Sequence, residues 1–148
     1  MTLCEQQKSV IRASLPVSVG YISGSMEPTQ WKNPTIWEKV LRTHRVMVST
    51  PQVLLDALRH GYIMMGRDIN LIVFDEAHHA QGKHPYNEIM REFYFILDRR
   101  TSPGVQESSF VRPMIMGLTA SPIYGGNAVT AFKWVSLAIY TDDYLIGS

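Results

Sequence analysis

Cysteine is almost absent from this sequence, because Cys4 is the only one among 148 residues. A single thiol forms neither an intrachain disulfide framework nor a zinc site built from several cysteines. Disulfides belong mainly to oxidising compartments. We therefore expect an intracellular protein, cytoplasmic or nuclear, that folds without covalent cross-links.

Long apolar runs and a strong charge of one sign are also missing. No stretch reaches the roughly 20 apolar residues that a membrane-spanning helix needs, and residues 1–8 lack the pattern of a secretory signal. We expect no membrane partner. The formal net charge is +1, so nucleic-acid binding would depend on local basic residues and backbone amides. With 45% hydrophobic residues, the chain has enough apolar material for one folded domain.

The most informative stretch that is present runs from Leu71 to His79, where four large apolar residues lead into Asp75 and Glu76. The apolar run predicts a strand buried on both sides, as in parallel sheets that helices cover. Ligands bind at the carboxyl ends of such strands. An Asp there can hold Mg²⁺, and a neighbouring Glu can orient or deprotonate an attacking water. A solvated turn that begins a helix is the plainer alternative.

A second buried strand is predicted for Met114–Leu118, which leads into Thr119 and Ser121. An acidic strand end beside a hydroxyl-bearing one fits two sides of a nucleotide. However, the sequence contains no Gly-x-x-x-x-Gly-Lys-Ser/Thr loop to hold nucleotide phosphates. The acidic strand end is therefore either a site for another ligand or half of a nucleotide site whose other half lies outside the chain.

Helices and strands are expected to alternate along the chain. The predicted helices cover residues 5–14, 31–41, 51–60, 85–97 and 128–140, and the predicted strands cover residues 17–22, 45–49, 71–74 and 114–118. This alternation is typical of the α/β class, with a parallel sheet and helices on both faces. Residues 98–112 are expected to form an exposed loop.

Two segments that follow predicted strands suit a phosphate. Gly24 and Ser25 come after the first strand, and their turn offers amides and a hydroxyl. Thr50, Pro51 and Gln52 begin the helix after the second strand, where the free amides and the helix dipole attract anions. Ordinary turn chemistry and helix capping account for the same residues.

A zinc site is the rival chemistry for the acidic stretch. Asp75, His78, His79 and His84 carry the carboxylate and imidazole ligands that zinc accepts. Their spacing argues against it, because no His-Glu-x-x-His pair is present and adjacent histidines on a helix point in different directions.

The same motifs carry a family resemblance. Residues 73–78 and 117–122 resemble motifs II and III of superfamily 2 helicases, and residues 79–80 together with 84–90 are similar to the branch that contains Dicer and the retinoic-acid-inducible RNA sensor. Residues 49–61 and 24–26 are most similar to fungal Dicer-like proteins. The resemblance extends from Leu3 to Asn127, whereas residues 132–148 fit poorly. We expect residues 1–148 to be an incomplete helicase ATP-binding domain that begins in the tail of motif Ia and lacks the phosphate loop.

The resemblance implies a RecA-like domain that binds ATP and Mg²⁺ and moves on double-stranded RNA in RNA silencing. It implies partners in a parent protein, namely a second helicase lobe and nuclease modules, which are absent from this sequence. A non-catalytic RNA-binding or interaction remnant is the alternative. The implied roles are Mg²⁺ ligand for Asp75, catalytic base for Glu76, coupling to the second lobe for His78, coupling of hydrolysis to RNA for Thr119 and Ser121, and RNA contact for Gly24, Ser25, Thr50, Pro51 and Gln52.

Overall fold

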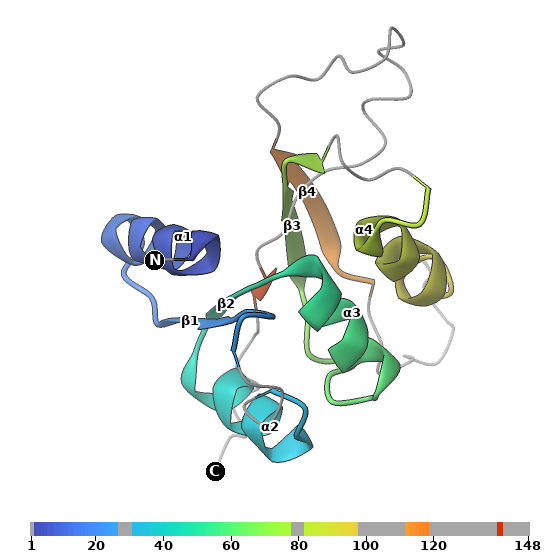
Figure 1. The fold of residues 1–148 in the computed structure, drawn as a ribbon, viewed down its shortest axis with the longest axis horizontal. Coiled ribbons are helices and arrows are strands. Elements are labelled where there is room, and N and C mark those ends of the chain that lie inside the picture. Colours follow the sequence, from blue (N-terminus) through green and yellow to red (C-terminus); the bar gives the residue numbers. More distant parts are fainter. Residues whose placement is uncertain (1, 27–30, 78–81, 98–111, 119–138, 141–148) are drawn as a thin grey trace, which may run out of the picture.

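A computed structural model describes residues 2–26, 31–77, 82–97, 112–118 and 139–140. Helices and strands alternate through most of this part of the chain (Figure 1). In chain order the elements are α1 (Leu3–Ser14), β1 (Val19–Ile22), α2 (Pro34–Thr43), β2 (Val46–Ser49), α3 (Pro51–Arg59), β3 (Leu71–Asp75), α4 (Pro85–Ile89), the π-helix η3 (Met90–Tyr94), β4 (Met114–Leu118) and β5 (Ile139–Tyr140).

The strands form one sheet in the order β1-β2-β5-β3-β4. β1 is parallel to β2, and β3 is parallel to β4 over their full lengths. The short strand β5 lies between these pairs and is antiparallel to both neighbours. The predicted α/β class with a parallel sheet is therefore confirmed, with one antiparallel strand that was not predicted.

The helix predicted for residues 128–140 is wrong at its end. Ile139 and Tyr140 form β5, in which Ile139 pairs with Met47 while Tyr140 pairs with Val46 and Leu71. The open backbone groups of β2 and β3 override the local helical pattern there, because a strand between them satisfies those groups. Residues 128–138 lie outside the described part of the chain.

Helices cover both faces of the sheet, as expected. Figure 1 shows α1 on one side of the strands and α3 and α4 on the other. The larger core lies under α2, α3, α4 and η3 and includes Trp37, Met47, Ile72 and Phe74. A smaller core lies under α1, where Cys4 packs with three valines of β1 and β2. Successive strand residues alternate between the two cores, as the period of two in a strand requires.

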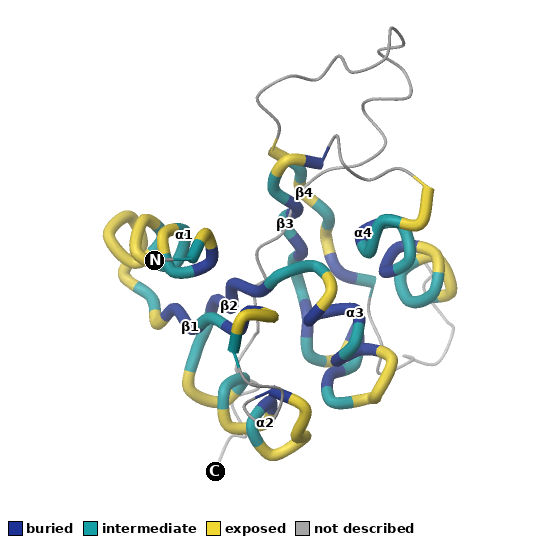
Figure 2. The backbone as a smooth tube through the Cα atoms, in the orientation of Figure 1, coloured by how far each residue is buried: buried dark blue, intermediate teal, exposed yellow. Residues whose placement is uncertain are grey.

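The prediction that β3 and β4 are buried on both sides is wrong for one face. Ile72 and Phe74 are buried, but Leu71 and Val73 are only half-buried. On β4, Met114 is 70% exposed, and Met116 and Leu118 are each more than half exposed (Figure 2). The reason is that α1 packs on β1 and β2, and no other helix in the described ranges covers this face of β3 and β4.

The helix ends follow from the local sequence. α1 begins two residues earlier than predicted, because Thr2 is its N-cap and forms a capping box with Glu5. α3 begins at Pro51 and is followed by Gly61 with a φ of 69°, as expected for a glycine that ends a helix. No helix in the described residues is long and apolar enough to cross a membrane.

The helix predicted for residues 85–97 changes type part of the way along. It begins as α4 at Pro85 and continues as η3, where the Phe95 N–H donates to the Met90 carbonyl at 3.0 Å. The predicted apolar stripe nevertheless reaches the core, because Met90 is buried and Phe93 packs against the same cluster.

Candidate functional site

Three strand ends meet around one cavity of about 610 Å³. The ends of β1, β2 and β3 all lie at the carboxyl edge of the sheet, because these strands point in the same direction. Six of the predicted site residues line this cavity, namely Gly24, Ser25, Thr50, Pro51, Asp75 and Glu76. The structure thus brings the predicted acidic residues and most of the predicted phosphate-contacting residues together.

One wall of the cavity carries hydroxyl groups. The hydroxyls of Ser23 and Ser25 lie 2.7 Å apart and hydrogen-bond with each other. Ser49, which is 7% exposed, and Thr50 each have a buried hydroxyl oxygen without a hydrogen-bond partner in the described structure. A buried hydroxyl left unpaired costs free energy, so this wall is suited to a ligand that accepts hydrogen bonds. We name Ser23, Ser25, Ser49 and Thr50 the hydroxyl wall.

Helix capping does not explain Thr50. The residue occupies the N-cap position of α3, yet its side chain makes no capping hydrogen bond. The first amides of a helix have no partner within the helix, and α3 has no side-chain acceptor for them. A phosphate at this end would receive hydrogen bonds from these amides and be attracted by the helix dipole.

Asp75 and Glu76 form the acidic part of the cavity lining, which is already hydrogen-bonded. We name these two residues the acidic wall, and the turn that they form at the end of β3 the acidic turn. The side-chain amide of Gln7 donates to one carboxylate oxygen of Asp75, and the Glu76 N–H donates to the other at 3.1 Å. The Tyr86 hydroxyl donates to the Asp75 carbonyl at 2.9 Å. α1, β3 and α4 therefore fix the acidic turn from three directions.

The acidic wall fits a magnesium ion that phosphates help to hold. Mg²⁺ usually takes one or two protein carboxylates and completes its shell with water and substrate phosphates. Asp75 supplies such a carboxylate at the cavity. Within the described ranges no three His, Cys, Asp or Glu side chains cluster as a metal site would need, so a metal held by protein ligands alone does not fit there.

Several predicted residues are not tested or are displaced. Gln52 does not line the cavity, because its side-chain amide donates to Asp56 at 2.9 Å along α3. His78, Thr119 and Ser121 lie outside the described residues. The same holds for His79, so of the rival zinc set only Asp75 and His84 can be placed, and both line the cavity.

Sequence analysis missed five polar residues at the cavity. Their signals were weak, because a Gln inside a helix or a Tyr after a Pro is ordinary in most proteins. Ser49 was the most accessible of them from the sequence, since it ends a predicted strand next to Thr50. The five are Thr2, Gln7, Ser23, Ser49 and Tyr86.

Two groups beside the acidic turn keep their protons at neutral pH. Burial raises the pKa of Tyr86 to about 12, and the charge of Asp75 adds to the rise. Burial also raises the pKa of the Cys4 thiol, with a smaller contribution from Glu5. Tyr86 therefore remains a hydrogen-bond donor, and Cys4 remains a neutral thiol instead of a nucleophilic thiolate.

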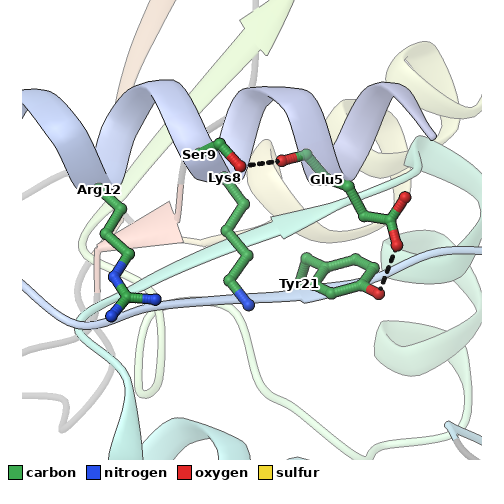
Figure 3. Close-up of a pocket in the computed structure, with 5 residues that line it drawn as sticks. All are labelled: Glu5, Lys8, Ser9, Arg12 and Tyr21. Carbon is green, nitrogen blue, oxygen red and sulfur yellow. Dashed lines mark hydrogen bonds between the residues drawn. The ribbon is translucent and has the colours of Figure 1, made fainter. Parts of the chain in front are cut away.

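A second pocket of about 610 Å³ lies between α1 and β1. Figure 3 shows the side chains of Lys8 and Arg12 extending from the side of α1 on which Tyr21 lies. Glu5 lies next to the Tyr21 hydroxyl. The Lys8 ammonium lies 5.0 Å from the centre of the Tyr21 ring. Glu5 accepts hydrogen bonds from Tyr21 and Thr2, and neither Lys8 nor Arg12 forms an ion pair with a described residue.

The sequence is similar to a known family and to several known proteins. The family model described as "Type III restriction enzyme, res subunit" matches residues 2–124. The chain is 43% identical to Dicer-like protein 2 of Neosartorya fischeri over 128 residues, which is 86% of this chain and 9% of that protein. It is 42% and 39% identical to Dicer-like protein 2 of Phaeosphaeria nodorum and Cryphonectria parasitica, over 83% of this chain and 8% of each relative. The chain thus spans about a tenth of the length of these relatives.

Proposed function

Because the chain belongs to the family of the type III restriction enzyme res subunit, we propose that it is part of an ATP-dependent helicase or translocase that acts on double-stranded RNA. In this proposal the acidic wall acts on Mg-ATP and the hydroxyl wall contacts the RNA backbone. The similarity to fungal Dicer-like proteins supports RNA as the nucleic acid and RNA silencing as the setting.

The observation that carries the proposal is the meeting of both walls at one cavity. The hydroxyl wall comes from the ends of β1 and β2, and the acidic wall comes from the end of β3. An enzyme that couples ATP hydrolysis to movement needs a structural connection between the residues that contact the nucleotide and the residues that contact the nucleic acid. Here Gln7 of α1 bonds to Asp75 while the first turn of α1 lines the cavity beside Ser23 and Thr50.

The two acidic residues take different roles in this proposal. Asp75 is held by Gln7 and by the Glu76 amide, so its carboxylate keeps one orientation. Asp75 would hold a Mg²⁺ ion, which would neutralise phosphate charge when bound. Glu76 lines the same cavity and orients the attacking water or accepts its proton.

The RNA role rests on the hydroxyl wall. Within the part of the chain that the structure describes, Ser49 and Thr50 carry buried hydroxyls without partners, and the side chain of the N-cap residue Thr50 makes no hydrogen bond to the first amides of α3. Phosphate oxygens accept hydrogen bonds from such groups without reading the base sequence. We therefore expect binding that is independent of sequence and weakened by salt.

A non-catalytic RNA-binding remnant is the second candidate, and one observation favours it. The sequence carries no phosphate loop, whereas the hydroxyl wall is complete in the described structure. In that case the chain would bind RNA and would not hydrolyse ATP by itself.

The RNA role is tested by titrating the chain into fluorescein-labelled double-stranded RNA and following fluorescence anisotropy. Thr50→Val keeps the shape of the side chain and removes its hydroxyl, so we expect affinity to fall by about three- to tenfold, the worth of one hydrogen bond. Thr43→Val is the matched control, because the Thr43 hydroxyl is exposed and, among the described residues, bonds only to the Lys39 and Val40 carbonyls of α2 and to the neighbouring His44 ring. Equal affinities for wild type and Thr50→Val would remove the hydroxyl wall from the proposal.

The two candidates are separated by calorimetric titration of the chain with Mg-ATP. Without a phosphate loop the acidic wall has few fixed contacts to the β- and γ-phosphates, so we expect weak binding or none. Restored binding when the segment is joined to a polypeptide that carries a phosphate loop would favour the helicase. RNA binding without ATP binding in both forms would favour the remnant.

A further inference from the structure

The acidic turn has an unusual backbone at Glu76. Its φ is 53°, and it is the one residue other than glycine with a positive φ in the described ranges. This left-handed conformation is sparsely populated by residues that carry a side chain. Such a residue keeps it only where surrounding contacts fix the backbone, so the contacts around Glu76 decide where its carboxylate points.

Tyr86 contacts this turn from another element, α4. Its hydroxyl donates to the Asp75 carbonyl at 2.9 Å, and that carbonyl belongs to the peptide group that joins Asp75 to Glu76. A hydrogen bond to the carbonyl fixes the plane of the peptide, and with it the direction in which the Glu76 backbone leaves β3.

Tyr86 is itself rigid. It is the second residue of α4, only 8% exposed, and it follows Pro85. Its ring lies 4.6 Å from the ring of Phe74 and 4.6 Å from that of His84, measured between ring centres. The Tyr86 N–H also donates to the His84 ring. Because these contacts hold the Tyr86 ring, its hydroxyl can fix the position of the Asp75 carbonyl that it contacts in the acidic turn.

We propose that Tyr86 is a positioning residue, whose hydroxyl holds the peptide between Asp75 and Glu76 so that Glu76 keeps its left-handed backbone and presents its carboxylate to the cavity. The functional meaning of this role rests on the proposed function of Glu76. The raised pKa of Tyr86 agrees with it, because the hydroxyl remains a donor throughout the pH range in which the turn would work.

The test uses Tyr86→Phe in the 148-residue chain without nucleotide or RNA, followed by nuclear magnetic resonance. This change keeps the ring packing and removes the hydroxyl. We expect the strong intraresidue NOE between the amide and α protons of Glu76, which marks a positive φ, to weaken. We also expect exchange of the Glu76 amide to rise by about three- to tenfold, since its bond to Asp75 depends on the same turn.

Tyr21→Phe is the matched control, because it removes a tyrosine hydrogen bond of the same 2.9 Å length, from Tyr21 to Glu5, away from the acidic turn. It should leave both Glu76 signals unchanged. The amide of Leu54, a fully buried residue in the first turn of α3, reports opening outside the acidic turn in every variant. Glu76 signals in Tyr86→Phe that match wild type, or that change only in step with Leu54, would overturn the proposal.

These outcomes are independent of the proposed function, because neither signal requires hydrolysis or RNA binding. A positive result with a chain that fails the RNA titration leaves the positioning role standing as a property of the turn. A negative result with a chain that binds RNA removes Tyr86 from the mechanism and leaves the proposed function intact.

Discussion

The two halves of the sheet differ in how completely they are covered. β1 and β2 have α1 on one face and the larger core on the other, and their buried residues alternate between both sides. β3 and β4 share the larger core, but on the opposite face Met114, Met116 and Leu118 are more than half exposed. We name β1 and β2 the finished half, because described elements cover both of their faces. We name β3 and β4 the open half, because no described helix covers the apolar face that carries Met114, Met116 and Leu118.

The two halves also differ in the side chains at their strand ends. The finished half ends in the hydroxyl wall, where the side-chain hydroxyls of Ser49 and Thr50 have no hydrogen-bond partner among the described residues. The open half ends in the acidic turn, where Gln7 and Tyr86 already bond to Asp75. The comparison teaches that the hydroxyl wall has hydroxyls whose hydrogen-bonding capacity is unused among the described residues, whereas the carboxylate of Asp75 is already positioned by hydrogen bonds within the protein.

The largest expected effect lies in the acidic wall. In a polypeptide that joins this segment to a phosphate loop and a second lobe, Glu76→Gln keeps the shape of the side chain but removes its basicity. We expect the RNA-stimulated ATPase rate to fall by a factor of about 10² to 10⁴, with little change in ATP affinity.

Asp75→Asn is the companion variant for that experiment. It should weaken Mg-ATP binding and hydrolysis together, because it changes the metal ligand. Near-normal hydrolysis by Glu76→Gln would contradict the base role and with it the difference between the two walls.

A second prediction concerns the stability of the finished half. A Cβ at Gly20 would lie 2.6 Å from the Met47 sulfur and 3.0 Å from the His44 ring. Because Met47 is only 1% exposed and cannot move freely, we expect Gly20→Ala to lower the free energy of unfolding by about 1–3 kcal/mol. Urea unfolding measures the change.

Gly24→Ala is the matched control for stability. A Cβ there would meet nothing closer than 3.8 Å, which is an ordinary contact. It should change the free energy of unfolding by less than about 0.5 kcal/mol. Equal losses for the two variants would mean that β1 and β2 are not packed as closely as the structure has them.

The third prediction concerns the pocket between α1 and β1, which we name the basic pocket after Lys8 and Arg12. It tests whether these two residues contact RNA phosphates together with the hydroxyl wall. Lys8 and Arg12 lie on one side of α1 without ion-pair partners among the described residues. If both contact RNA phosphates, Lys8→Ala/Arg12→Ala should lower the slope of log affinity against log salt by about 1.4 to 1.8, at roughly 0.7 to 0.9 per contact.

The control for this pair removes the same two residue types from α2. Lys39→Ala/Arg42→Ala changes the net charge equally, but Arg42 is already paired with Glu38 at 2.6 Å. Its salt slope should remain that of wild type. An equal drop for both double variants would assign the effect to net charge instead of to this pocket.

The smallest expected effect tests the open face of β4. Met116 is 51% exposed beside two other exposed apolar side chains, and such faces promote association. Met116→Lys should reduce self-association measured by light scattering at high protein concentration, and it should leave the melting temperature within a few degrees. A monodisperse wild-type chain would show that this face does not drive association.

Local sequence patterns predicted most of the individual elements. Pro51 at the first position of α3, and Gly61 after its last apolar turn, predicted the ends of this helix, because proline geometry and a glycine with positive φ act within a few residues. The resemblance to a fungal Dicer-like helicase segment is also confirmed, by the family match and by identities near 40%. The zinc alternative remains untested for His78 and His79, which lie outside the described part of the chain.

Contacts between distant residues were beyond prediction. Gln7 and Asp75 are 68 positions apart, and the sequence does not reveal that α1 would reach β3. Likewise, Ile139 and Tyr140 read as the end of a helix and became a strand between β2 and β3. Both outcomes depend on which backbone and side-chain groups the other elements leave open.

The sequence by itself determined the α/β class, the acidic strand end at Asp75 and Glu76, and the start of α3 at Pro51, because each depends on residues that are neighbours in the chain. Only the tertiary structure decided that these segments share one cavity, that Gln52 does not line it and that the Tyr86 hydroxyl bonds to the Asp75 carbonyl. The physical reason is that directions and partners are set by packing between elements, which no local pattern encodes.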